Sequence, residues 1–338
     1  MNEDRLCQIL DAFPRLTVLV VGDFFLDKYL VIDPALEEVS LETGLAAHQV
    51  VERRTSPGAA GTVVGNLRAL GVKVIALGVI GDDGNGYDLA RGLQACGADI
   101  APLEQLPERF TPTYTKPLVR EAGGAERELE RLDIKNRRPL PPDVERRVIA
   151  RLRELVSQAD GVAIVDQVAD PHGGLITPAV RAELATLARA HSGKPFLADS
   201  RARIGLFRDV MLKPNREEAR RAAGAGASAE AWGRILQRRA GRPVFLTLGA
   251  AGILVCEGET VQRVPAVPVT GPLDTVGAGD SVTAGVLAAL CAGATPIEAA
   301  LVGTLVASVT IRQLGTTGVA TPEQVREQLS NYHLIIDN

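Results

Sequence analysis

Short aliphatic runs alternate with amphipathic segments along most of the chain, and this alternation constrains the fold more than any other feature. Residues 17–21 are β-branched or aliphatic and end in Gly22-Asp23, which is typical of a buried parallel strand. Further strands are expected at residues 73–79, 162–165, 195–198 and 244–248. Helices are expected between them, at residues 62–70, 85–95, 144–157, 178–190, 216–223 and 229–239. This order predicts an α/β fold with a mostly parallel sheet and helices on both of its faces.

Two stretches, residues 29–55 and 109–120, interrupt the alternation and have the composition of strands outside the main sheet. We expect them to pair as a small sheet over one edge of the larger one and to act as a lid. The whole chain, residues 1–338, is therefore predicted to be a single domain with an inserted lid. Because such strands have exposed edges, a second copy of the chain is expected to cover them in a homodimer.

Composition narrows the class of protein. Of 338 residues, 46% are hydrophobic and 23% are charged, which are ordinary globular values. A net charge of -4 and only 4% aromatic residues argue against nucleic acid as a partner. The four cysteines are far apart, and the acidic first residues do not form a secretory signal, so we expect a cytoplasmic protein.

Residues 281–311 are almost purely apolar, with Glu298 as their only charge, and are long enough to cross a bilayer. Gly293 and Pro296 divide the segment, however, and Gly, Ala and Thr replace the bulky apolar residues and aromatic belt of a membrane helix. Two helices buried in an α/β protein are therefore expected, and no membrane contact.

The strongest local signal is D-T-V-G-A-G-D at residues 274–280, directly before this apolar segment. A loop of small residues at a helix N-terminus exposes unpaired N–H groups beside the positive end of the helix dipole, which favours a phosphate. Asp280 is placed to cap the helix, and at the same position it could take a proton from a hydroxyl group. A glycine-rich turn with a capping aspartate, without any ligand, is an alternative explanation of the same residues.

Other motifs of phosphate chemistry are missing. The sequence contains no G-x-x-x-x-G-K-[ST], no G-x-G-x-x-G after the first strand, and no H-R-D or D-F-G. Its four histidines are dispersed, which gives no support to a histidine-rich metal site or a histidine-based triad.

The 274–280 loop resembles the C-terminal signature of the ribokinase-like (PfkB) carbohydrate kinases, and further family motifs follow the family order along nearly the whole chain. They are V-V-G-D with L-D at residues 20–27, P-G-A-A at 57–60, K-P-N with Glu218 at 213–218, and T-L-G with Gly252 at 247–252. Within the family the chain is most similar to the D-glycero-β-D-manno-heptose-7-phosphate kinases, through G-D-x-x-L-D-x-Y at 22–29 and R-L-D at 131–133. The resemblance implies a ribokinase-like three-layer fold with a small β lid.

The resemblance also implies ATP-dependent, Mg²⁺-requiring phosphorylation of a hydroxyl group on a sugar or sugar phosphate, with a heptose-7-phosphate-like acceptor favoured. Asp280 would be the general base, and the N–H groups of Gly277, Ala278 and Gly279 would hold the transferring group. Asn215 and Glu218 would organise Mg²⁺ and phosphates through water, although both also suit an ordinary helix N-terminus. The implied nucleotide-binding residues are Asn215, Glu218, Thr247, Gly249, Gly252 and Asp274.

The implied substrate-binding residues lie in the first half of the chain. Asp27 would accept hydrogen bonds from two vicinal sugar hydroxyls, and Gly58 would let the sugar approach the backbone. Thr62 follows at the position of a family asparagine. Lys116 and Arg131 could reach a substrate phosphate, yet alternating Arg and Glu over residues 126–153 predict a solvated helix face instead.

Four residues depart from the family pattern. Ala59 stands at a family glycine, Thr62 at an asparagine, Val276 at a threonine and Lys213 at a small threonine or serine. These departures affect the sugar end more than the phosphate end. They leave open a kinase for a free hexose, pentose or nucleoside, and a non-catalytic relative that binds nucleotide or sugar.

Overall fold

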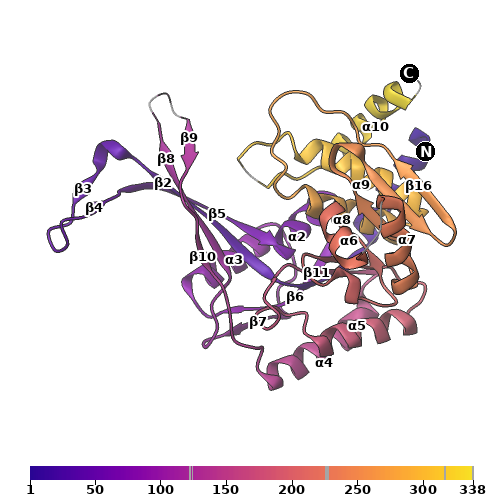
Figure 1. The fold of residues 1–338 in the computed structure, drawn as a ribbon, viewed down its shortest axis with the longest axis horizontal. Helices are drawn as coiled ribbons and strands as arrows, with labels where there is room; N and C mark the ends of the chain where they lie inside the picture. The colour runs from indigo at the N-terminus through magenta and orange to yellow at the C-terminus, as the bar shows by residue number, and fades with distance from the viewer. Residues whose placement is uncertain (122, 124, 225–227, 316, 337–338) are drawn as a thin grey trace.

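The computed structural model describes residues 1–121, 123, 125–224, 228–315 and 317–336, with side chains up to residue 332. Within these residues a nine-stranded sheet forms the middle of the molecule, in the order β16-β15-β14-β13-β12-β11-β1-β6-β7 (Figure 1). The strands are β1 Thr17–Gly22, β6 Lys73–Gly81, β7 Leu103–Leu106, β11 Gly161–Asp166, β12 Phe196–Ser200, β13 Met211–Leu212, β14 Val244–Thr247, β15 Ile253–Glu257 and β16 Thr260–Val264. Every pairing from β7 to β14 is parallel, and β15 and β16 are antiparallel.

Helices cover both faces of this sheet. The first face carries α1 Glu3–Leu10, α2 Ala60–Ala69, α3 Gly84–Ala95, α8 Ala278–Cys291, α9 Pro296–Thr310 and α10 Pro322–Ile336. The second face carries α4 Pro142–Gln158, α5 Pro178–Ala190, α6 Arg216–Ala223 and α7 Ala229–Ala240. Short helical turns lie at Phe13–Arg15, Pro34–Leu36, Ile204–Leu206 and Gly249–Ala251. The predicted three-layer α/β architecture is confirmed.

The central strand β1 explains why aliphatic residues dominate the strands. Val18 and Val20 pack into the core on the α8 side, whereas Leu19 and Val21 pack into the core on the α4 side. All four are fully buried. A parallel strand covered on both faces needs apolar residues at every position rather than at alternate ones.

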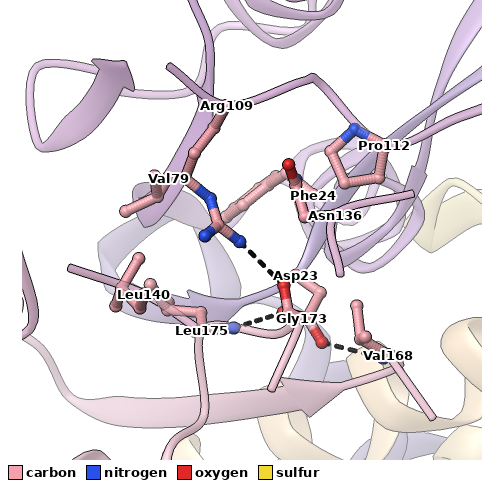
Figure 2. Close-up of a pocket in the computed structure, with 10 residues that line it drawn as sticks. All are labelled: Asp23, Phe24, Val79, Arg109, Pro112, Asn136, Leu140, Val168, Gly173 and Leu175. Carbon is pink, nitrogen blue, oxygen red and sulfur yellow. Dashed lines mark hydrogen bonds between the residues drawn. The ribbon is translucent and has the colours of Figure 1, made fainter. Parts of the chain in front are cut away.

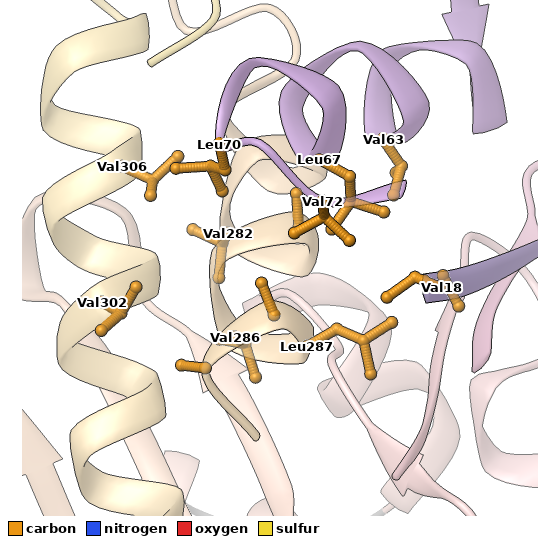
Figure 3. Packing of buried hydrophobic residues seen from close by; sticks show 14 of the residues in the cluster. Val18, Val63, Leu67, Leu70, Val72, Val282, Val286, Leu287, Val302 and Val306 are labelled. Atoms are coloured by element: carbon orange, nitrogen blue, oxygen red, sulfur yellow. The ribbon is translucent and has the colours of Figure 1, made fainter. Parts of the chain in front are cut away.

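The apolar segment at residues 281–311 forms most of α8 and α9, as expected. Val282 and Val286 of α8 lie between Val306 of α9 and the residues of α2 in Figure 3. The two helices approach so closely that a Cβ on Gly285 would lie 2.9 Å from the Cα of Gly303. In the described part of the chain, no helix has both the length and the apolar character needed to span a bilayer.

A second, smaller sheet projects from one end of the large one (Figure 1). Its path within the described residues is β10-β8-β2-β5, and β9 pairs with β8. The strands are β2 Phe24–Ile32, β5 Val50–Ala59, β8 Thr113–Arg120, β9 Glu126–Glu128 and β10 Leu132–Ile134. The two stretches predicted to pair do so, because β2 is antiparallel to β5 and parallel to β8. A hairpin of β3 Glu38–Val39 and β4 Ala46–Ala47 forms a separate two-stranded sheet beyond the far end of the small one.

The expectation of a solvated helix face from residue 126 onward was wrong up to residue 141. Residues 126–128 and 132–134 are strands, and α4 begins only at Pro142. Alternating charges suit an exposed edge strand as well as a helix, since Glu126 of β9 forms ion pairs with Arg54 and Arg120 across the sheet. The prolines at 139, 141 and 142 prevent an earlier helix start.

Ala59 has a strained backbone at the junction between the small sheet and α2. Its φ is 53° and its ψ is -115°, a combination that L side chains rarely adopt. It stands immediately before the first residue of α2, at the position where the resemblance expects glycine. The departure seen in the sequence therefore has a conformational cost, on the order of 1–3 kcal/mol.

Ala59→Gly is expected to raise the free energy of unfolding by about 1 kcal/mol, because glycine removes this strain at a smaller cost in unfolded-state entropy. Urea unfolding followed by circular dichroism measures the change. Ala60→Gly, at the next and ordinarily helical residue, is the matched control and should destabilise by about 1 kcal/mol. Equal destabilisation by both substitutions would contradict the interpretation.

Candidate active site

The glycine-rich loop leads into α8 with the geometry of an anion site. Gly277 is the N-cap of the helix and has a left-handed φ of 78°, which favours glycine. A Cβ on Gly277 would lie 3.3 Å from Thr62 and 3.4 Å from Thr317, so the loop is held between these two residues. The prediction that Asp280 caps the helix was wrong, since Asp280 is the third residue of α8 and Gly277 occupies the cap.

Several backbone donors of this loop are available to a ligand. The N–H groups of Gly277, Gly279 and Asp280 have no acceptor within the described part of the chain. The N–H of Ala278, in contrast, donates to the carbonyl of Thr275 at 3.2 Å. Together with the positive end of the α8 dipole, the free donors form a concentrated site for a phosphate oxygen.

The Asp280 carboxyl group is partly buried and has a strongly perturbed pKa. Burial is the largest cause, and the nearby carboxylate of Asp199 adds to it, so the pKa rises to about 7. Lys213 and Arg201 oppose this increase, and Asp27 contributes to it. A carboxylate with a pKa near neutrality is suited to accept a proton and to release it again.

A buried ion pair lies beside the loop. The ammonium of Lys213 is 2.9 Å from Asp199 Oδ2, and both side chains are almost inaccessible to solvent. Asp199 is in β12, Lys213 directly follows β13, and the two strands are parallel neighbours, which brings these positions together. The Thr283 hydroxyl lies 3.2 Å from the same oxygen of Asp199. Sequence reasoning missed Asp199, although D-S directly after the strand expected at residues 195–198 could have indicated it.

Asn215 and Glu218 form a reciprocal capping box at the start of α6. Asn215 Oδ1 accepts from the Glu218 N–H at 2.9 Å, and Glu218 Oε2 accepts from the Asn215 N–H at 2.8 Å. Burial raises the pKa of Glu218, Asp199 adds to the increase, and the Asn215 N–H and Lys213 oppose it. Its second oxygen has no partner among the described residues. The two residues therefore form an ordinary helix N-terminus, which was the alternative explanation. One carboxylate oxygen of Glu218 stays available to a ligand.

This donor set fits Mg²⁺ only through water. Among the described residues no group of three or more His, Cys, Asp or Glu side chains is arranged to hold a metal ion. Mg²⁺ usually retains several waters and binds through one or two carboxylates together with substrate phosphates. The free oxygen of Glu218 meets that limited requirement.

The predicted nucleotide residues around β14 are close to Asn215. Thr247 forms a parallel bridge with Asn215, and its N–H donates to the Pro214 carbonyl at 2.9 Å. Gly249 and Gly252 form the turn between β14 and β15, with φ of 62° and 88°. A Cβ on Gly252 would lie 2.1 Å from the carbonyl oxygen of Val264 in β16, so the close approach of this turn to β16 requires the glycine. A Cβ on Gly249 meets no described atom within 4 Å.

Asp274 connects the glycine-rich loop to the segment that follows α9. One of its oxygens accepts from the Val276 N–H at 3.0 Å and the other accepts from the Gly315 N–H at 3.1 Å. Its own N–H donates to the Ile311 carbonyl at 2.8 Å. In this structure Asp274 therefore fixes the path of the loop.

Asp27 and Gly58 face each other across β2 and β5. A Cβ on Gly58 would lie 2.4 Å from Asp27 Oδ2, so only glycine leaves room for this carboxylate. Burial raises the pKa of Asp27, while the ammonium of Lys116 at 3.6 Å opposes the increase. The sequence predicted close approach of a sugar as the reason for Gly58, and the structure adds the carboxylate itself as a second reason.

Two tyrosines complete this end of the site: Tyr29, which is a motif residue without a predicted role, and Tyr114, which sequence reasoning missed. Lys116 Nζ lies 3.2 Å from the Tyr29 hydroxyl oxygen and 4.7 Å from the centre of its ring. The Arg131 guanidinium stacks 4.3 Å above the ring of Tyr114 and forms two hydrogen bonds with Asp133. Tyr114 is the cross-strand neighbour of Asp27, and Lys116 is the neighbour of Tyr29. Register within the small sheet thus places both cations beside Asp27.

A small cavity lies apart from these residues, beside Asp23 just before β2 and Pro112 just before β8 (Figure 2). Asp23 accepts hydrogen bonds there from the N–H groups of Gln167, Val168 and Leu175, while Arg109 donates to the Gly173 carbonyl. Burial and the nearby Asp166 raise the pKa of Asp23 to about 6. The cavity holds about 20 Å³, and none of the predicted site residues lines it. We interpret the hydrogen bonds of Asp23 at this cavity as contacts that hold the loop after β11 in place.

Comparison with known proteins identifies the family. The model of the pfkB family carbohydrate kinases matches residues 25–324. The chain belongs to this family. It is therefore a carbohydrate kinase, an enzyme that transfers a phosphoryl group to an alcohol group of a sugar.

The relatives are similar in sequence to nearly the whole chain. The bifunctional protein HldE of Trichlorobacter lovleyi is 32% identical over 98% of this chain and 67% of its own length. The bifunctional protein HldE of a Caulobacter species is 32% identical over 96% of this chain and 65% of its own length. The kinase described here spans about two thirds of the length of these relatives.

A solved structure confirms the fold class. Arabidopsis thaliana ribokinase, in complex with ribose and ATP, superposes with a TM-score of 0.67 at 18% sequence identity. The match covers 93% of this chain and 98% of that ribokinase. The ribokinase-like fold predicted from the sequence is confirmed.

Proposed function

We propose that this kinase transfers the γ-phosphoryl group of ATP to a hydroxyl group of a sugar phosphate, with a heptose-7-phosphate-like acceptor favoured. The observation that carries the proposal is the first turn of α8. There, free backbone N–H groups lie within one turn of the Asp280 carboxylate. An anion site beside a proton acceptor is what phosphoryl transfer to a hydroxyl requires.

Asp280 accepts the proton of the acceptor hydroxyl as that oxygen attacks the γ-phosphorus. The new oxygen–phosphorus bond forms while the bond from the γ-phosphorus to the bridging oxygen breaks, and ADP leaves with that oxygen. The N–H groups of Gly277, Gly279 and Asp280 donate to the oxygens of the transferring group. The N–H of Ala278 joins them once it leaves the Thr275 carbonyl.

The nucleotide residues position the other end of the donor. Mg²⁺, when bound, neutralises phosphate charge and polarises the transferring group. Glu218, through its free oxygen, and Asn215 would hold this ion through water. The predicted contacts of the nucleotide itself are with Thr247, Gly249 and Gly252, while Asp274 keeps the loop in place.

The acceptor is recognised on the small sheet. Asp27 accepts hydrogen bonds from two neighbouring hydroxyls, Gly58 leaves room beside it, and Thr62 lies between this end and the loop. The ammonium of Lys116 lies 3.6 Å from Asp27, so an acceptor phosphate bound by Lys116 would lie close to the hydroxyls that Asp27 binds. Arg131 is the second cation for the same phosphate.

The small sheet acts as a lid in this proposal, within a single domain of residues 1–338. The Thr62 hydroxyl lies 3.5 Å from the Pro57 carbonyl oxygen of β5, and Thr62 is next to Gly277 of the loop, so the two ends of the site are near each other. Closure of the lid excludes water from the transfer.

Asp280→Asn is expected to lower turnover by about 10²–10⁴-fold, because the amide cannot accept the hydroxyl proton. ADP release is measured across heptose, hexose and pentose phosphates, the free sugars and nucleosides. Glu217→Gln, an exposed carboxylate on α6, is the control and should keep full turnover.

Turnover of Asp280→Asn within tenfold of the wild type would contradict the role of this residue as the base. Preference for a free hexose, pentose or nucleoside would contradict the sugar-phosphate assignment. Binding of ATP without ADP release on any acceptor would instead indicate a non-catalytic relative.

The pH dependence follows from the Asp280 pKa of about 7. The base must be deprotonated, so kcat/KM for the acceptor should be constant above this pH and fall about tenfold per unit below it. Asp199→Asn removes a negative neighbour that raises this pKa and should move the acidic limb to lower pH. A wild-type profile that is flat down to about pH 5 would contradict the assignment.

The lid also supports a homodimer. The β3–β4 hairpin beyond the small sheet exposes large apolar side chains, including Val39, Leu41 and Leu45, with exposed fractions of 68%, 104% and 70%. β5 is the edge strand of the small sheet. A second copy of the chain would cover both the edge and the apolar residues.

Light scattering at micromolar concentration is expected to give twice the 35.7 kDa chain mass. The double substitution Val39→Asp and Leu45→Asp should return the protein to one chain mass, because it places charges in the contact. Asp substitutions at the exposed Leu206 and Leu314, outside the small sheet, are the control. A wild-type monomer would contradict the dimer.

A further inference from the structure

Three of the segments that join the small sheet to the rest of the molecule meet at the cavity shown in Figure 2. Asp23 leads into β2, residues 109–112 lead into β8, and Asn136 follows β10. All three segments lie against the loop between β11 and α5, at residues 167–177. The positions of β2 and β8 therefore depend on the contacts that fix this junction.

The Asp23 carboxylate holds the loop after β11 at two places. Its Oδ2 accepts hydrogen bonds from the N–H groups of Gln167 and Val168, each at 2.9 Å, and its Oδ1 accepts from that of Leu175 at 2.8 Å. The backbone of Asp23 also donates to a carbonyl of β11 and accepts from the N–H of Ala60, the first residue of α2. Asp23 thus connects the start of β2 with β11, with α2 and with both ends of the loop.

Both oxygens of Asp23 act as acceptors, and this explains why the chain has a carboxylate here. An asparagine has one acceptor oxygen, so it would turn its amide N–H₂ towards at least one of the three backbone N–H groups. Asp23 is only 6% exposed, and burial together with the neighbouring Asp166 raises its pKa to about 6. The three hydrogen bonds to the charged group offset the cost of burying it beside a like charge.

Arg109 fixes the other two segments to the same loop. Its Nη2 donates to the Gly173 carbonyl at 2.9 Å, and its Nη1 lies 3.2 Å from the carbonyl oxygen of Arg138 and 3.3 Å from that of Pro139. Burial lowers the pKa of Arg109, and the negative charge of Asp23 opposes this decrease. One guanidinium therefore joins the segment before β8, the segment after β10 and the loop, while the Asp23 carboxylate stabilises its charge.

We propose that Asp23 and Arg109 are positioning residues for the acceptor, because they fix the starts of the strands that carry the acceptor site. Asp27 is in β2 and Lys116 is in β8. This inference rests on the proposed function, which places the acceptor on the small sheet. Neither positioning residue is placed to touch the acceptor, because their cavity adjoins the core on the α4 side, whereas α8 packs on the other face. A displacement of about 1 Å in an orienting group can cost about 10²-fold in rate.

Asp23→Asn tests the role of the carboxylate. We expect the acceptor KM to rise by about tenfold or more, because β2 loses part of its anchor, while the ATP dissociation constant from calorimetry changes less than about twofold. Asp160→Asn is the matched control, because Asp160 also accepts a backbone N–H, from Thr17 at 2.8 Å, but at the opposite end of β1. This control should keep the acceptor KM of the wild type.

Arg109→Met removes the second contact and decides the proposal if Asp23→Asn does not fold. Its acceptor KM should also rise about tenfold, and Arg109→Lys, which can still donate to the Gly173 carbonyl, should recover part of the loss. The double variant should lose less than the product of the two single losses, because both residues act on one junction. Folded variants that keep the wild-type acceptor KM, or that lose ATP and acceptor affinity equally, would overturn the proposal.

The two proposals fail in different ways. Failure of the wild type to release ADP with any acceptor would contradict the proposed function alone. Hydrogen exchange then decides this inference, since it needs no acceptor: the amides of β2 and β8 should exchange about tenfold faster in Asp23→Asn, while those of α8 and α9 keep their wild-type rates. Unchanged exchange in β2 and β8 would show that Asp23 does not hold the small sheet in place.

Discussion

The close packing of α8 against α9 is the constraint on which the rest of the site depends. Gly285 and Gly303 let the two helices touch backbone to backbone, and α2 covers the other side of α8. This packing holds α8 rigidly on the large sheet and directs its N-terminus to the carboxyl edge of the strands. A helix terminus can present free N–H groups to a ligand only if the helix itself is fixed, and here the apolar residues 281–311 provide that rigidity.

Charge balance is the second principle of the site. Asp27, Asp199, Glu218 and Asp280 would repel a nucleotide if they acted alone. Lys213 and Arg201 oppose the negative charge at the loop, and Lys116 and Arg131 do so at Asp27. The balance keeps Asp280 near its titration point rather than permanently ionised. Carboxylates and cations at each end therefore support binding and proton transfer together.

The parts of the site that the sequence predicts are those encoded locally. The loop at 274–280 and the capping pair of Asn215 and Glu218 are each contained in a short segment of chain, so the loop stood out from its own residues and the pair from the family resemblance. Asp199 and Tyr114 were missed, and Tyr29 was given no role, because their roles arise from register between strands far apart in sequence. Local patterns also fail where the same composition suits a helix and a strand, as the charged residues 126–134 show. There the neighbouring strand β8, rather than the residues themselves, decided for a sheet.

The departures from the family pattern acquire a common meaning from their positions. Ala59 holds a backbone conformation that suits glycine, and Thr62 contacts the loop through Gly277, so both lie at the junction of lid and loop. Lys213 lies on the other side of the same loop and is buried there with its partner. A chain that had lost its function would be expected to replace such a pair by apolar residues, because that replacement is often neutral or stabilising. Retention of the complete pair beside an intact G-A-G-D loop therefore favours an active kinase with an altered phosphate site over a degenerate one.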